Sequence, residues 1–173
     1  PPTITCFDQD GNFDPDKQRE VIRFLINKKV YGLFITGSYG SFPLMSIEER
    51  KQVAEVIFEE TDGKVPIIVQ IGTPDTKSAL QLAKYAENLG ASAVASVIPY
   101  YFSGFAYSED QITEYFRKLV DSVKIPVFLY NNPKTTAYNV SPELLKKIAD
   151  VGLKGIKDSS GNLVQMAEYI MYV

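Results

Sequence analysis

The sequence predicts an α/β protein of the (β/α)₈-barrel class, in which parallel strands alternate with helices. Short apolar runs alternate with longer amphipathic stretches along all 173 residues. The runs begin at intervals of about 30 residues, the size of a βα unit in such a barrel. With 45% hydrophobic residues, the chain can bury the core of one domain, which we expect to span residues 1–173. About six βα units are expected, so the barrel should be incomplete at its C-terminal end.

The expected strands are near-continuous apolar runs, which is typical of parallel strands that are covered on both faces. The first is the short run at residues 3–7. The others lie at residues 32–36, 65–71, 93–98, 125–130 and 153–157.

Amphipathic stretches between these runs predict helices at residues 15–29, 46–60, 76–89, 108–123 and 141–150, and a further one begins at Val164 and runs to Val173. Ser46 with Glu49 forms a capping-box pattern, and Pro142 suits the first position of a helix. Gly90 and Gly152 follow two of the stretches, where a left-handed residue usually ends a helix.

Composition excludes several classes of function. The formal net charge of −3 comes without a basic stripe, which argues against nucleic acid and anionic lipid as partners. The chain has no apolar run of about 18 residues and no export-signal pattern, so we expect a cytoplasmic protein without a membrane partner. It has no histidine and one cysteine. We therefore expect no metal, no cofactor and no Ser-His-Asp relay.

Hydroxyl-bearing residues follow most of the expected strands. In a barrel, the carboxyl ends of the strands build the active site. The segments that should meet there are residues 36–40, 99–101, 130–133 and 157–160. An open, doubly wound sheet would show the same alternation, but the glycine-rich phosphate loops of nucleotide-binding proteins are missing.

Lys157 is the lysine placed at the end of an apolar strand and facing the predicted site. A lysine amine that is partly shielded from water can attack a ketone and form an iminium, which accepts electrons when a C–C bond breaks. Alternatively, Lys157 extends its amine into solvent at the strand end or pairs with Asp158. Tyr130, on the neighbouring strand, could carry protons to this amine or could simply pack at the rim.

The turn at residues 37–40 could bind a carboxylate. Ser38 and Tyr39 have hydroxyl groups, and backbone amides in a turn can hold an anion without a cation. Gly37 and Gly40 could instead serve only to permit a tight turn.

Several ordered motifs resemble one family. They are G-S-Y-G (37–40) with P-L-M-S-I-E-E-R (43–50), P-Y-Y (99–101), Y-N-N-P (130–133) and G-I-K-D-S-S-G (155–161). Together they resemble the dihydrodipicolinate synthase/N-acetylneuraminate lyase family, whose members are class I aldolases acting on pyruvate. The resemblance implies that Lys157 forms the Schiff base, that Tyr130 and Ser38 relay protons, and that Tyr39 helps to bind the pyruvate carboxylate. It also implies a homodimer or homotetramer in which Tyr101 reaches into the neighbouring subunit's site.

Two departures from the family pattern bear on the substrate. Tyr39 and Ser41 replace the second hydroxyl residue and the glutamate of the usual G-T-T-G-E. Thr135 stands where dihydrodipicolinate synthases carry an arginine that pairs with a substrate carboxylate, and a hydroxyl does not replace a bidentate guanidinium. We therefore expect a lyase that cleaves a 2-keto-3-deoxy sugar acid to pyruvate and an aldehyde. The alternatives are a dihydrodipicolinate synthase, a keto-sugar-acid dehydratase of the same family, and a barrel that binds a sugar acid without turnover.

Overall fold

The structure is a computed structural model that describes residues 1–102 and 107–172. Five parallel strands form one sheet in the order β1-β2-β3-β4-β5. Each strand pairs with the next one along the chain, as the barrel topology requires. Their bounds are β1 Leu33–Ile35, β2 Ile67–Gln70, β3 Ala93–Ser96, β4 Val127–Asn131 and β5 Gly155–Asp158. These five strands were all predicted, with ends that differ by up to two residues.

The helices also lie where the amphipathic pattern placed them. They are α1 Pro15–Asn27, α2 Ile47–Thr61, α3 Thr76–Asn88, α4 Glu109–Ser122, α6 Pro142–Asp150 and α7 Leu163–Tyr172. Val173, at the end of the last predicted helix, lies outside the described residues. The structure adds a 3₁₀ turn, Phe42–Leu44, and a one-turn helix, α5 Pro133–Thr136. Neither is among the elements that the sequence predicts.

The predicted helix boundaries have the expected local chemistry. The capping box between Ser46 and Glu49 is present in both directions, and Pro142 begins α6. Gly90 and Gly152 have φ angles of +88° and +106°, which L-residues rarely adopt, so glycine at these positions ends the helix without strain.

The prediction of a strand at residues 3–7 is wrong in its extent. The N-terminal segment makes a single parallel bridge, Pro2 to Phe34, with backbone hydrogen bonds from Thr3 to Phe34 and from Phe34 to Pro1. Beyond it, Cys6 accepts a bond from Asp14 and donates one to the Gln18 side chain. Because its backbone groups are used in this way, the segment cannot continue the ladder, and five strands form the sheet instead of six.

Side chains of the sheet alternate between two environments. Leu33, Ile35 and Leu129 are fully or almost fully buried, whereas Phe34 and Phe128, next to them in the chain, are only half-buried. The first set faces the helices and belongs to the core, and the second lies on the opposite face. The largest fully buried side chains of the core are Ile22, Ile35, Ile57, Ile71, Ile98, Ile112, Phe116, Leu119, Leu129, Leu144, Leu145 and Ile148.

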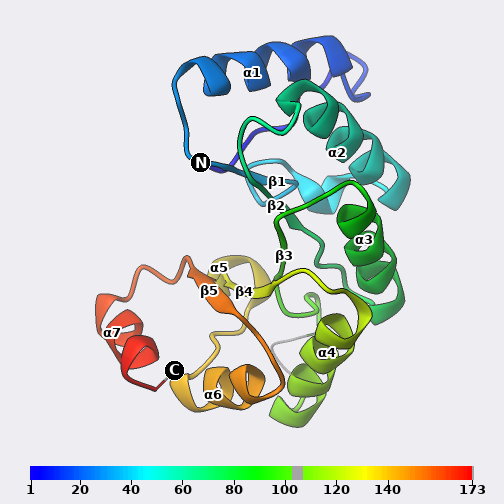
Figure 1. Cartoon of the computed structure of the whole chain (residues 1–173). Coiled ribbons are helices and arrows are strands. Elements are labelled where there is room, and N and C mark those ends of the chain that lie inside the picture. Colours follow the sequence, from blue (N-terminus) through cyan, green and yellow to red (C-terminus); the bar gives the residue numbers. More distant parts are fainter. Residues whose placement is uncertain (103–106, 173) are drawn as a thin grey trace.

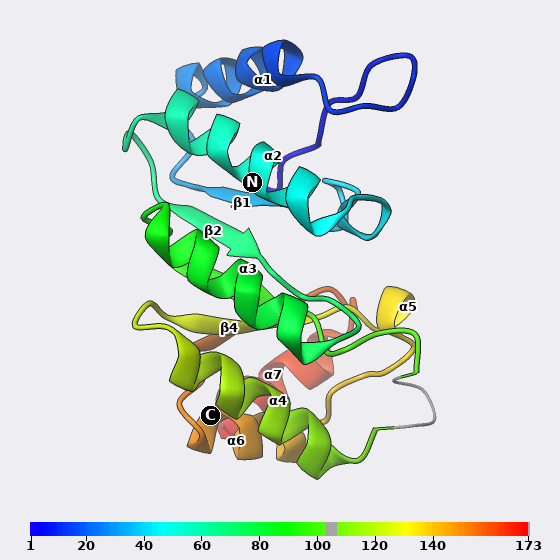
Figure 2. The ribbon, with the colours of Figure 1, turned by 90° about the vertical axis from the view of Figure 1, so that its right-hand side faces the viewer.

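The sheet curls with its helices on the convex side. In Figure 1 the helices follow one another around an arc, and the strands lie inside it. In Figure 2, β2 points toward the edge of the molecule at which α5 lies, which is the carboxyl edge of the sheet. Within the described residues, none of the helices combines the length and the apolar character needed to cross a membrane.

Replacing Leu129 with Ala should destabilise the fold. Leu129 is 0% exposed and its removal leaves a cavity, so we expect the free energy of unfolding to fall by about 2–5 kcal/mol. Leu163→Ala is the matched control, because Leu163 is 85% exposed and should change stability by less than about 0.5 kcal/mol. Urea denaturation measures both values. Equal effects of the two substitutions would contradict this assignment of the core.

Candidate active site

Lys157 and Tyr130 are direct partners in the ladder between β5 and β4. Both side chains therefore leave the sheet on the same face, the one that does not pack on the helices. The Lys157 Nζ lies 3.2 Å from the centroid of the Tyr130 ring. Asp158, next in the chain, faces the other way and accepts hydrogen bonds from Asn131 and Ser160. The alternative of a Lys157–Asp158 pair is thus not what the structure contains.

The curvature of the sheet brings its two edge strands together at Lys157. The amine also lies 4.8 Å from the ring centroid of Phe34, which belongs to β1 at the far edge of the sheet from β5. The Phe34 and Tyr130 rings meet edge to face, with centroids 5.6 Å apart. Two aromatic faces therefore attract the ammonium form and shield the amine from part of the solvent.

Ser38 and Tyr130 form a pair of hydroxyl groups beside the lysine. Their oxygens are 3.3 Å apart, and either one can be the donor. Ser38 follows β1 and Tyr130 belongs to β4, so the contact again depends on the curved sheet. The structure thus brings together all three residues predicted to be catalytic, Lys157, Tyr130 and Ser38.

Asn132 and Ser159, which were not among the residues predicted from the sequence, also interact with this pair of hydroxyls. The Asn132 amide nitrogen lies 3.3 Å from the Ser38 hydroxyl and 3.2 Å from the Tyr130 hydroxyl. Ser159 interacts with the Tyr130 hydroxyl, and its backbone amide bonds the Asn131 carbonyl at 2.8 Å. Both residues lie inside the quoted motifs, and the expectation that strand ends converge was the signal that could have identified them.

The surroundings of Tyr130 lower the pKa of its phenol. Burial is the largest single influence and acts to raise this pKa. Hydrogen bonding with Lys157, Ser38 and Ser159, together with the positive charge of Lys157, outweighs it. A phenol that gives up its proton more readily is better suited to proton transfer near neutral pH.

The turn at residues 37–40 contains Ser38. Hydrogen bonds to its carbonyl groups hold it. The Ser41 amide bonds the Ser38 carbonyl, and the Phe42 amide bonds the Gly37 carbonyl. A Cβ on Gly37 would lie 2.8 Å from the Phe34 ring, and one on Gly40 would lie 3.2 Å from the Thr5 hydroxyl. Neither glycine has a positive φ, so close packing, and not the left-handed conformation, requires glycine here.

The other predicted binding residues lie further out. The Tyr39 side chain is 74% exposed, and Tyr101 is 79% exposed with its ring against Phe102. Thr135, in α5, is exposed and donates its hydroxyl to the Asn132 carbonyl. Among the described residues, the hydrogen bonds and ring contacts of these three side chains do not involve the Lys157 amine. Tyr100, in contrast, packs edge to face against Phe42.

A buried polar network lies behind the site, on the helix side of β4 and β5. The Asn131 amide donates to Asp158 at 2.8 Å and to Asn139 at 2.9 Å, and its oxygen accepts from the Val140 amide. Tyr169, from α7, bonds the Val140 carbonyl. Because Asn131 follows Tyr130 and Asp158 follows Lys157, this network holds the two strands that carry these candidate catalytic side chains.

Arg50 anchors the strand end next to the site. This arginine is 3% exposed and donates to the carbonyls of Gln70 and Gly72 at 2.8 and 3.0 Å. Burial lowers its pKa to about 10. Its guanidinium also lies 5.2 Å from the ring centroid of Phe42. Arg50 therefore ties α2 to the segment that leaves β2.

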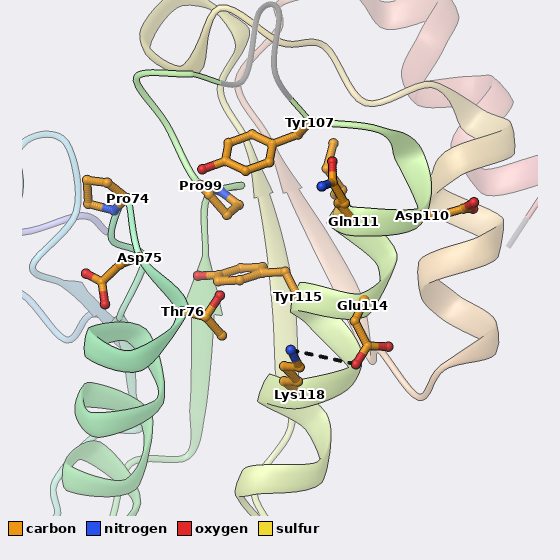
Figure 3. A pocket seen from close by; sticks show the side chains of 11 residues that line it. Pro74, Asp75, Thr76, Pro99, Tyr107, Asp110, Gln111, Glu114, Tyr115 and Lys118 are labelled. Carbon is orange, nitrogen blue, oxygen red and sulfur yellow. Dashed lines mark ion pairs between the residues drawn. The ribbon is translucent and has the colours of Figure 1, made fainter.

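A pocket among the described residues lies elsewhere. It measures about 580 Å³ and is lined by residues at the amino ends of α3 and α4. Figure 3 shows Asp75 and Thr76 on one side and Tyr115 and Lys118 on the other. It lies on the helical side of the sheet, whereas the candidate active site is defined by the group of Lys157, Tyr130 and Ser38.

Tyr130 should titrate early among the tyrosines of the folded protein. Its pKa is lowered, whereas burial, followed by the charge of Asp158, raises the pKa of Tyr169 to about 12. The measurement follows the absorbance of tyrosine phenolates as the pH rises. Tyr130→Phe should remove the earliest phase of this titration, and the control Tyr169→Phe should remove a late phase. An unchanged early phase in Tyr130→Phe would rule out the lowered pKa.

Known proteins share this arrangement of strands and helices. The model of the Dihydrodipicolinate synthetase family matches residues 1–173. A probable 2-dehydro-3-deoxy-D-pentonate aldolase, YjhH, of Escherichia coli (strain K12) is 35% identical over 178 residues, covering 100% of this chain and 58% of its own length. The 4-hydroxy-tetrahydrodipicolinate synthase of Methanocaldococcus jannaschii is 34% identical over 98% of this chain and 58% of its own.

Solved structures agree. The crystal structure of YagE, a prophage protein of E. coli K12 in complex with pyruvate, matches with a TM-score of 0.94 and 34% identity, over 100% of this chain and 58% of that one. The chain thus spans 58% of the length of each of these three proteins. The family's proteins are TIM barrels, and its named members are lyases, aldolases and synthases. The predicted fold class and family are confirmed, and this chain belongs to the dihydrodipicolinate synthetase family.

Proposed function

We propose that the protein carrying this chain is a class I pyruvate lyase in which Lys157 forms the Schiff base. The observation that carries the proposal is the position of the Lys157 amine, between two aromatic rings and beside the Tyr130 and Ser38 hydroxyls. An amine needs such neighbours to form an imine, because water must be expelled from the carbinolamine and protons must move in both directions.

The chemistry assigns a role to each of the three residues. The neutral amine of Lys157 attacks the C2 ketone and gives a carbinolamine. Tyr130, backed by Ser38, protonates the departing hydroxyl, so that water leaves and an iminium forms. In the cleavage direction the C3–C4 bond then breaks, its electrons enter the iminium to give an enamine, and the C4 hydroxyl loses its proton as the aldehyde leaves. Protonation of C3 and hydrolysis release pyruvate and free Lys157.

The turn at residues 37–40 is proposed to hold the substrate carboxylate. Within the described part of the chain, the amides of Ser38, Tyr39 and Gly40 donate no hydrogen bond. Consecutive free amides in a turn form a concave anion site. Donors fixed in advance next to the lysine would orient the C2 ketone toward its amine.

A sugar acid is the proposed substrate class. Thr135 is neutral, and its hydroxyl is already bonded to the Asn132 carbonyl. The relatives carry two kinds of name, sugar-acid aldolase and 4-hydroxy-tetrahydrodipicolinate synthase. A site without a cation at Thr135 favours the polyol aldehyde over a partner with a second carboxylate.

The full barrel and the oligomer belong to the same proposal. We propose that this chain is part of a single eight-stranded barrel domain and that the protein works as a homodimer or homotetramer. Tyr101 supports this, because its side chain is 79% exposed and an exposed aromatic is a frequent contributor to interfaces. In the assembled protein it would complete the site of the neighbouring subunit.

Borohydride trapping with pyruvate tests the Schiff base. In the full natural chain, incubation with pyruvate, reduction and peptide mass analysis should place an added pyruvyl mass on Lys157. Lys157→Ala should lose the adduct and the turnover, whereas Lys154→Ala, an exposed lysine just before β5, should keep both. Tyr130→Phe should lower kcat by about 10²–10⁴-fold, because it removes a general acid. A folded wild-type protein that binds pyruvate without an adduct would instead be a non-catalytic binding barrel.

Substrate choice should respond to charge at residue 135. The wild type should prefer a polyol aldehyde to an aldehyde that carries a carboxylate. Thr135→Arg should raise kcat/KM for the carboxylate-bearing aldehyde by about 10–100-fold relative to the polyol, as expected from about 1.5–3 kcal/mol for a hydrogen bond to a charged group. Thr135→Met, of similar bulk but neutral, is the control. A wild type that prefers the carboxylate-bearing aldehyde would contradict the sugar-acid assignment.

A further inference from the structure

Asn132 occupies a fixed position between the two hydroxyls of the proposed proton relay. It follows β4 directly and precedes Pro133, which favours an extended backbone at this residue, and φ and ψ are −138° and 76°. Its carbonyl accepts hydrogen bonds from the backbone amides of Thr135 and Thr136 and from both of their hydroxyls. The side chain is held as well, because the residue is only 7% exposed.

The three polar groups form a closed triangle. The Asn132 Nδ2 lies 3.3 Å from the Ser38 Oγ and 3.2 Å from the Tyr130 hydroxyl, and those two oxygens are 3.3 Å apart. A carboxamide nitrogen carries two hydrogens and accepts none. It can therefore donate one hydrogen to each oxygen, and both hydroxyls must then use their own protons elsewhere.

Proton counting then gives the relay a direction. Ser38 and Tyr130 bring one hydroxyl proton each. One of these protons fills the contact between the two oxygens, since a hydrogen bond there needs one donor. The other cannot point at Asn132, whose nitrogen accepts nothing, so it points out of the triangle, where Ser159 or a bound keto acid can accept it.

We propose that Asn132 is a positioning residue that, by donating to both hydroxyls, keeps one relay proton directed at the bound keto acid. The inference rests on the proposed Schiff-base function and deepens it. Lys157 is the charged group that acts on the Tyr130 phenol, from β5. Asn132 adds a neutral donor from the other side, and donors on both sides stabilise the phenolate left when the proton is transferred.

Replacing the amide with a carboxylate separates this role from packing. Asn132→Asp has nearly the same shape but only accepts hydrogen bonds when ionised, so it would turn both hydroxyl protons toward itself and place a negative charge beside the phenol. Asn132→Leu removes the donor without adding charge. Asn88→Asp is the matched control, because it makes the same chemical change at an exposed position at the end of α3.

The experiment measures, in the full natural chain, the rate at which pyruvate forms the borohydride-trapped adduct as a function of pH. We expect Asn132→Asp and Asn132→Leu to slow adduct formation by about 10–10²-fold, as a misdirected reacting group does, with the KM for pyruvate little changed. The limb of the pH profile that follows Tyr130 should move to higher pH in both variants, because loss of a donor raises the pKa of the phenol. Asn88→Asp should match the wild type.

Two outcomes of the kinetic experiment would overturn the inference. If Asn132→Asp keeps the wild-type rate and pH profile, the side-chain oxygen, not the nitrogen, faces the hydroxyls. If Asn132→Leu keeps both, the residue only packs. A second readout tests the Asn132 hydrogen bonds without the reaction. Absorbance titration should show a higher Tyr130 pKa in the folded Asn132→Leu variant than in the wild type. An absent wild-type adduct together with that shift would refute the Schiff-base function but leave the Asn132 hydrogen bonds standing; an absent shift would refute the bonds themselves.

Discussion

The register between β4 and β5 is the constraint on which the site depends. Tyr130 pairs with Lys157, and Asn131 pairs with Asp158. Side chains alternate along a strand, so one pair faces the reactive space and the other faces the helices. The Asn131–Asp158 hydrogen bond of 2.8 Å therefore fixes, from behind, the relative height of the phenol and the amine. A shift of one residue would send Tyr130 or Lys157 to the helix side.

Sheet curvature is the second requirement, and it explains why side chains from both edges of the sheet meet at Lys157. Phe34 and Ser38 come from β1 and the turn after it, while Lys157 comes from β5 at the other edge of the sheet. In a flat sheet three other strands would lie between these groups. The twist and closure of a barrel bring them into contact. Arg50 and the close packing of Gly37 on Phe34 hold the surrounding segments in place.

The polar groups of the site differ in how they are supported. Tyr130, Asn132 and Ser38 bond one another, and Ser159 joins from the end of β5. Tyr39, Tyr101 and Thr135, in contrast, have exposed side chains. Fixed groups suit proton transfer, which needs distances held to a fraction of an ångström. Exposed groups suit contacts that form with a substrate or a second subunit.

The amino-acid sequence alone predicts the alternation of strands and helices, the capping box at Ser46, the helix start at Pro142, and the ordered motifs that identify the family. These follow from local chemistry, namely apolar periodicity, hydrogen bonding at helix ends and the residues that a reaction needs. It also selected Lys157, Tyr130 and Ser38 correctly as neighbours. Three features emerge only from the folded structure: the N-terminal segment leaves the sheet after the bridge of Pro2 to Phe34, packing requires glycine at position 37, and Asn132 joins the two hydroxyls. Each of these depends on contacts between segments far apart in the chain, which local patterns do not encode.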